Sequence, residues 1–169
     1  MSNSDCHTII VCIGNELIAD DAAGFEIYTR LQELFENEVS ERIIRLEFCG
    51  LGGIDIFPLM EGETDMIVVD AVQFGNAPGT IHIIPCDSLP LAGSAISAHG
   101  LGLRETIEIG KILHPEKMPE RITLVGIEGR CFNRTREYMT DEVRTAIGSA
   151  VTTIVEIVSR GQNYECITV

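Results

Sequence analysis

The sequence predicts an α/β fold in which helices cover both faces of a mostly parallel, twisted sheet that includes one antiparallel strand. Short apolar runs rich in β-branched residues alternate with amphipathic segments of helical spacing, the pattern of repeated strand–helix–strand units. Apolar residues make up 45% of the 169 residues, which is enough for one buried core. The length, and the lack of any linker-like stretch, indicate a single domain over residues 1–169.

Strands are expected where the apolar runs are short and continuous, at residues 8–13, 42–48, 66–69, 80–85 and 121–127. The connection from the third to the fourth of these runs contains the turn-forming residues 74–79 and is too short for a crossover helix. The strand at 80–85 is therefore the one expected to run antiparallel to its neighbour.

Helices are expected at residues 22–35, 101–113 and 140–159, with a short helix or turn at 54–60. The inward positions expected for the first two long helices are Phe25, Tyr28, Leu31, Leu34 and Phe35, and then Leu103, Ile107 and Ile112. Asp20 or Asp21 occupies the expected N-cap of the first helix, and Thr140 that of the last.

The charge balance argues against two classes of partner, nucleic acids and anionic membranes. Basic residues number 12 and acidic residues 26, which gives a formal net charge of −14. Nucleic acids and anionic membranes are bound by clustered Lys and Arg, so neither is an expected partner.

The six cysteines form no C-x-x-C pair and no apparent disulfide framework. With no signal peptide and no membrane-spanning stretch in view, we expect a cytoplasmic monomer with reduced thiols.

Ligands of open α/β sheets bind outside the carboxyl ends of the strands, so the residues that follow each predicted strand are candidates for a site. The first strand is followed by Asp20 and Asp21, the third by Asp70 and the last by Glu128, while the loop before the second long helix contains His99. Two carboxylates and an imidazole are a recognised ligand set for a divalent metal. The sequence therefore predicts a rim site of mixed oxygen and nitrogen ligands.

Each candidate also has a plainer explanation. Asp70 follows four apolar residues, so its charge needs a cation or hydrogen bonds, and acceptance of backbone N–H bonds from the next loop is an equally common solution. One of Asp20 and Asp21 suffices as a helix cap, which leaves the other for a separate task. A lone loop histidine such as His99 is more often simply solvated.

Other features are discounted. His7, His82 and His114 lack a carboxylate context and are expected to be structural or exposed, and Cys12 is expected in the core. Residues 50–53, GLGG, do not form a G-x-G-x-x-G fingerprint, and no G-x-S-x-G elbow occurs. Reasoning from the residues alone thus gives a candidate metal site without a reaction.

Three segments supply a resemblance when they are taken together. Residues 14–24, GNELIADDAAG, show the pattern G-N-x-L-x-x-D-[DE]-x-x-G. Asp70 and Ala71, followed by GNAPGT at 75–80, show D-A…G-x-x-P-G-T, and SAHGLGL at 97–103 shows S-x-H-x-x-G-L. VGIE at 125–128 fits the strand expected next. In this order and spacing, the set resembles the hydrogenase maturation endopeptidases over nearly the whole chain, up to the final helix.

The resemblance implies an aspartyl-type endopeptidase that cuts a short C-terminal extension from the large-subunit precursor of a nickel–iron hydrogenase. It also implies that nickel carried by the precursor is the recognition element, and another divalent metal can substitute. The metal ligands of the family carry over to Asp21, Asp70 and His99, which are also the implied catalytic residues. Asp21 or Asp70 is then the candidate general base, and a docking role for the same groups is left open.

One departure from the family concerns the substrate. Many members carry Asp-x-Gly-Thr after the second strand, whereas residues 48–51 here are FCGL and lack both the Asp and the Thr. The hydrogenase subgroup that is served is therefore left open. The alternative functions are a metal-dependent hydrolase or amidase of another substrate, a flavodoxin-like binding module, and a maturation chaperone that grips the precursor without cutting it.

Overall fold

A mixed sheet forms the centre of the computed structural model, which describes residues 7–90, 96–97, 102–160 and 167–168. Within these ranges the strands are β1 (Thr8–Ile13), β2 (Ile44–Cys49), β3 (Asp65–Gln73), β4 (Ile81–Pro85), β5 (Ile96–Ser97), β6 (Arg121–Glu128) and β7 (Ile167–Thr168). They pair in the order β2-β1-β3-β6-β4-β7, with β5 beside β3. The first four strands of this order are mutually parallel, and β4 runs antiparallel to β6.

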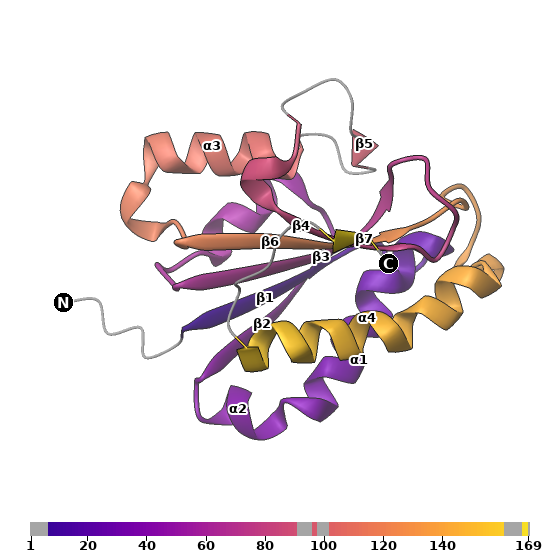
Figure 1. The fold of residues 1–169 in the computed structure, drawn as a ribbon, viewed down its shortest axis with the longest axis horizontal. Coiled ribbons are helices and arrows are strands. Elements are labelled where there is room, and N and C mark those ends of the chain that lie inside the picture. The colour runs from indigo at the N-terminus through magenta and orange to yellow at the C-terminus, as the bar shows by residue number, and fades with distance from the viewer. Residues whose placement is uncertain (1–6, 91–95, 98–101, 161–166, 169) are drawn as a thin grey trace.

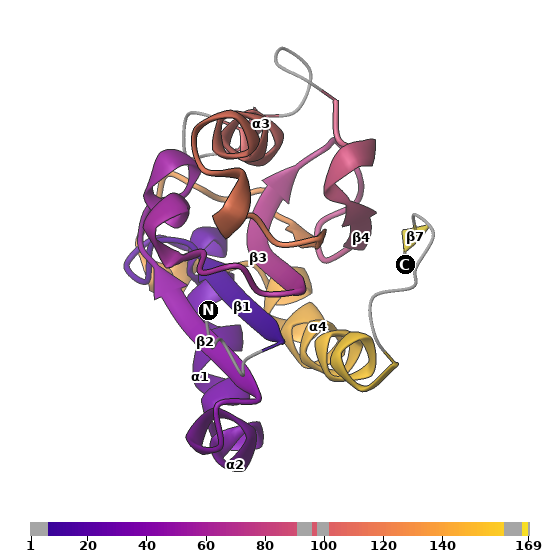
Figure 2. The same ribbon diagram turned by 90° about the vertical axis from the view of Figure 1, so that its left-hand side faces the viewer.

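The helices form a layer on each face of the sheet. They are α1 (Ala23–Leu34), α2 (Glu36–Ser40), α3 (Leu103–Leu113) and α4 (Asp141–Arg160), and the longest 3₁₀ helix is Gly53–Leu59. Helices α1 and α4 contact each other on one face, and α3 contacts the 3₁₀ helix on the other, as Figure 1 and the turned view of Figure 2 show. No helix in the described ranges combines the length and the apolar character needed to cross a membrane.

The predicted fold class is confirmed, because the sheet is mostly parallel with helices on both faces. The strand expected at 80–85 is β4, and it is antiparallel as predicted. Two further antiparallel pairings involve β5 and β7, which were not predicted because two residues are too few to show a periodicity.

Two apolar clusters lie on opposite sides of the sheet, because successive side chains of a strand point to opposite faces. Ile10 and Val69 belong to the cluster beneath α1 and α4, whereas Val11 and Val68 belong to the cluster beneath α3. The central strands β1 and β3 are thus buried on both sides, which explains why each contains a continuous apolar run rather than an alternating pattern.

Three local predictions about helices were wrong. Leu34 was expected to point inward, but it is 57% exposed because the buried row of α1 continues from Leu31 to Phe35 instead. Ile112 was expected to point inward, but it is 80% exposed because the inner face of α3 follows Thr106, Ile107 and Gly110. Ala22 is the N-cap of α1 and provides no side-chain cap, so neither preceding aspartate caps that helix. The predicted cap of α4 is confirmed, since the Thr140 hydroxyl accepts the N–H of Val143 at 3.5 Å.

Candidate functional site

The loop after β1 is folded tightly over the end of that strand. The N–H of Asn15 donates to Oδ2 of Asp21 at 2.9 Å. A Cβ atom on Gly14, whose φ is +146°, would lie 2.1 Å from the backbone oxygen of Asp21, and one on Gly24 would lie 1.9 Å from the backbone oxygen of Ile13. The absence of side chains at these two glycines therefore lets Asp21 and the first turn of α1 sit directly on the strand end.

The two neighbouring aspartates in the 3₁₀ helix Asp20–Ala22 have different surroundings. Asp20 is fully buried, and its Oδ2 accepts the N–H groups of Arg130 and Cys131, both at 2.8 Å. Its Oδ1 accepts the N–H of Thr140 at 2.7 Å and the hydroxyl of the same residue at 3.0 Å. Asp20 thus anchors the segment that precedes α4, and Asp21 remains as the acid of the pair that is adjacent to the end of β1.

Asp70 lies within β3 rather than at its end. The strand continues to Gln73 because β6 pairs with it as far as Val72 and β5 pairs with both Val72 and Gln73. By alternation, Asp70 shares the α3 face of the sheet with Val68 and Val72. Its side chain is largely covered, since the residue is 6% exposed. A buried carboxylate on an apolar sheet face is consistent with the expectation that Asp70 has a specific task.

The sheet register brings the two predicted acids to the same end of the molecule. Cys12 pairs with Val69, so Asp70 is level with Ile13 on the neighbouring strand. Ile13 is followed directly by Gly14, which lies against the backbone of Asp21. Strand β3 also contacts the 3₁₀ helix that contains Asp21. Asp21 and Asp70, from segments far apart in the sequence, thus lie toward the same end of the parallel strands.

The third predicted ligand, His99, lies outside the described residues. In the part of the chain that the structure describes, no group of three His, Cys, Asp or Glu side chains is placed to hold a metal ion. The ligand set of Asp21, Asp70 and His99 therefore stays a prediction.

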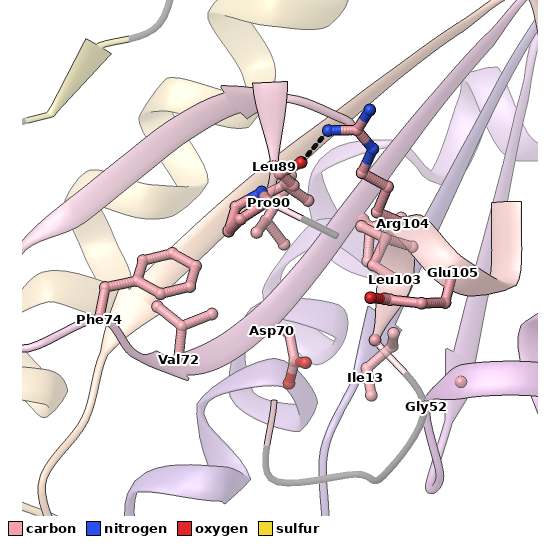
Figure 3. Close-up of a pocket in the computed structure, with 14 residues that line it drawn as sticks. Ile13, Gly52, Asp70, Val72, Phe74, Leu89, Pro90, Leu103, Arg104 and Glu105 are labelled. Carbon is pink, nitrogen blue, oxygen red and sulfur yellow. Dashed lines mark hydrogen bonds between the residues drawn. The ribbon is translucent and has the colours of Figure 1, made fainter. Parts of the chain in front are cut away.

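A small cavity opens beside Asp70 between the sheet and the start of α3 (Figure 3). Its volume is about 50 Å³. Apolar side chains from several elements line it, namely Val68, Val72, Phe74, Leu89, Leu103 and Leu124. A guanidinium N–H of Arg104, on the first turn of α3, donates to the backbone oxygen of Leu89 and so joins two of the cavity walls.

Glu128 does not face a rim site. It is 2% exposed, and its carboxylate accepts the N–H groups of Phe74 at 3.1 Å and Gly75 at 2.8 Å and a hydrogen bond from His82 at 3.0 Å. The expectation that His82 and His114 have no carboxylate context was therefore wrong, since His114 also lies 3.2 Å from Glu116. His82 could not be matched to Glu128 from the sequence, because their contact depends on the pairing of β4 with β6.

Comparison with known proteins gives a consistent family assignment. The HycI family model, described as hydrogenase maturation protease, matches residues 8–157. The hydrogenase expression/formation protein HupD of Rhodobacter capsulatus is 30% identical over 122 residues, which cover 71% of this chain and 56% of that protein. The hydrogenase 2 maturation protease of Escherichia coli K12 is 28% identical over 121 residues, or 70% of this chain and 71% of that protein.

Solved structures show the same fold. The hydrogenase maturating endopeptidase HybD from Escherichia coli matches with a TM-score of 0.75 and 23% identity, over 96% of this chain and 97% of that one. The maturation protease HycI from Thermococcus kodakarensis KOD1 matches with a TM-score of 0.69 and 24% identity, over 90% and 92% of the two chains. The sheet that carries Asp70 and is followed at the end of β1 by Asp21 therefore belongs to a fold shared with these proteins.

Proposed function

The chain belongs to the hydrogenase maturation protease family, and on this premise we propose that it is an endopeptidase acting on the large-subunit precursor of a nickel–iron hydrogenase. It removes the C-terminal extension of that precursor, and the nickel already loaded into the precursor is the recognition element. The observation that supports this proposal most directly is the position of Asp21 and Asp70 toward the same end of the parallel strands β1 and β3.

The choice between the two neighbouring acids follows from their contacts. Asp20 accepts four hydrogen bonds through its two oxygens, so binding a metal would cost the anchor of the segment before α4. Asp21 accepts the N–H of Asn15, in the loop that closes over the end of β1. That end of β1 lies beside Asp70 of β3. Asp21 is accordingly the ligand, and Asp20 is the residue that holds the ligand-bearing turn in place.

In the proposed reaction the nickel ion is part of the substrate. Asp21, Asp70 and His99 complete its coordination alongside thiolates of the precursor, since carboxylate oxygen and imidazole nitrogen both suit a divalent ion. Binding through the metal places the adjacent peptide bond against the two carboxylates. One of these carboxylates then accepts the proton of the attacking water and passes it to the leaving nitrogen, so that the peptide bond breaks and the extension is released with a new amino terminus.

Incubation of the purified chain with nickel-loaded and nickel-free precursor tests the proposal, with intact-mass spectrometry as the readout. We expect loss of the mass of the extension from the nickel-loaded precursor alone. Asp21→Asn, Asp70→Asn and His99→Asn, changed singly, should each slow cleavage by about 100-fold or more, the scale of a lost general base. Glu33→Gln, on an exposed face of α1, is the matched control.

Two results would contradict the proposal. Normal processing by all three variants would remove the site from the reaction. Stable association with the loaded precursor and no change of mass would instead support the chaperone alternative.

A further inference from the structure

We infer that the cavity beside Asp70 is a specificity pocket that binds one apolar side chain of the substrate segment carrying the scissile bond. The inference rests on the proposed function and deepens it, because it names the kind of residue that the enzyme accepts next to the cleaved bond. It is argued from the size of the cavity, its lining and its position relative to Asp70.

The size of the cavity matches one aliphatic side chain. Its volume of about 50 Å³ is several times the space that a single water needs. Roughly four groups of the size of a methyl or a water fit in that space, which corresponds to the side chain of Val, Leu, Ile or Met. A complete small-molecule ligand or cofactor would need a pocket of about 300 Å³ or more on typical surveys. A single side chain of a larger molecule is therefore the occupant that fits.

The lining favours an uncharged occupant. Val68 and Val72 form the floor, Leu124 adds to it from β6, and Leu103 from α3 and Leu89 from the segment after β4 form the walls. The Asp70 and Glu105 carboxylates line the same cavity. The Arg104 side chain also lines the cavity, so its charges are mixed. A charged side chain of either sign would lose its hydration against the apolar walls, whereas a hydrocarbon side chain gains from leaving water.

The position of the cavity makes it part of the proposed site. Val68, Asp70 and Val72 alternate along one face of β3, so the floor of the cavity and the proposed ligand belong to the same strand (Figure 3). A residue seated in this cavity is necessarily close to whatever binds Asp70. In a polypeptide substrate whose metal is held at Asp70, the side chain that reaches the cavity belongs to a residue close to the metal and to the scissile bond.

Substitutions at Leu103 test the inference through cleavage. Leu103 lies on the first turn of α3 and is half-buried, so Leu103→Trp fills the cavity and Leu103→Ala widens it with little cost to the core. Leu113→Trp introduces the same bulk at the far end of the same helix, where the side chain is 61% exposed, and serves as the control. Nickel-loaded precursors with Ala, Leu, Phe, Asp or Lys at each position flanking the scissile bond are the substrates.

At one flanking position we expect the unmodified protein to prefer Leu over Asp by roughly ten- to hundredfold in kcat/KM, the scale of burying one aliphatic side chain. Leu103→Trp should shift the preference to Ala, Leu103→Ala should shift it to Phe, and Leu113→Trp should leave it unchanged. Efficient cleavage with no preference at either flanking position, or with a preference that Leu103 variants leave unaltered, would overturn the inference while leaving the proposed function intact.

A binding measurement keeps the pocket testable when no precursor is cut. Methyl-labelled protein is titrated with two short capped peptides that differ in having Leu or Asp at the centre, and the methyl signals of Val72 and Leu124 are followed by NMR. The inferred pocket requires shifts of these signals with the Leu peptide, at least about tenfold weaker binding of the Asp peptide, and loss of the shifts in Leu103→Trp but not in Leu113→Trp. Absence of shifts with both peptides would overturn the pocket independently of any activity.

Discussion

Glu128 and His82 form a buried pair in which Oε2 of the glutamate lies 3.0 Å from Nε2 of the imidazole. The same carboxylate accepts the N–H groups of Phe74 and Gly75, at the start of the loop that follows β3. The Phe74 ring packs edge-on against the His82 ring, with 5.1 Å between the ring centroids, and also lines the cavity beside Asp70. One carboxylate on β6 thereby fixes both the exit of β3 and a wall of the cavity.

Replacing Glu128 with Gln should therefore destabilise the fold. The amide offers one acceptor oxygen to three donors, so at least one buried N–H group loses its partner. We expect a loss of about 1–3 kcal/mol in the free energy of unfolding, measured by urea denaturation. The same change at exposed Glu33 should alter that free energy by less than about 0.5 kcal/mol. Equal stability of Glu128→Gln and the unmodified protein would show that the network is not needed for the loop.

The same substitution should affect different properties at the neighbouring acids, namely stability at Asp20 and cleavage at Asp21. Asp20→Asn turns an NH₂ group toward buried donors and should cost about 2 kcal/mol or more in unfolding free energy. Asp21→Asn keeps an oxygen for the N–H of Asn15, so its stability should change by less than about 1 kcal/mol while precursor cleavage falls by about 100-fold. Thermal unfolding and the cleavage assay, run on both variants, separate the two roles. A large stability loss in Asp21→Asn would assign it a structural role instead.

Glycine to alanine changes should have opposite signs at two helical positions. Gly24 lies where a Cβ would approach the backbone oxygen of Ile13 to 1.9 Å, so Gly24→Ala should destabilise by about 1–3 kcal/mol or prevent folding. Gly148, on the exposed face of α4, has its nearest such neighbour, Arg30 Nη1, at 3.8 Å. Gly148→Ala should stabilise by about 0.5–1 kcal/mol through higher helix propensity. Urea denaturation of both variants tests the pair, and a neutral Gly24→Ala would contradict the close packing of α1 on β1.

Two cysteines should resist alkylation in the folded protein. Burial raises the pKa of the Cys12 thiol far above its ordinary value and that of Cys86 to about 12. Both thiols stay protonated at neutral pH, and the thiolate is the reactive form. Peptide mass spectrometry after treatment with iodoacetamide should find both residues unmodified in the native protein and fully modified in urea. Equal labelling under the two conditions would contradict their burial.

The strands could be predicted because burial on both faces of the sheet leaves a direct trace in the sequence. β1 is almost wholly apolar, and β3 contains the continuous apolar run 66–69. The end of β3 was misjudged because Asp70 looked like a terminator, whereas pairing with β6 as far as Val72 and with β5 at Gln73 carries the strand on. Ile112 was misjudged because its side chain lies more than a third of a turn away from Ile107 around the helix.

The candidate site was predictable in part. Asp70 was recognisable as an acid within an apolar run, and the motif with two glycines around Asp21 has a physical cause in the close packing at the end of β1. The division of labour between Asp20 and Asp21 was not predictable, because it depends on donors near Arg130 and Thr140 that are more than a hundred residues away. The cavity was equally hidden, since its lining comes from β3, β6, α3 and the segment after β4.

The central position of β3 has a consequence for how relatives of this protein can diverge. A strand hydrogen-bonded to parallel neighbours on both sides cannot slip by one residue without turning its whole side-chain pattern to the wrong face. Asp70 is therefore held by a strand whose register is fixed on both sides. Leu89 and Leu103, which form the opposite wall of the cavity, lie outside the sheet and can change without moving the acid. On the inference that this cavity binds a substrate side chain, substrate range can evolve by exchange of a few wall residues around a fixed carboxylate.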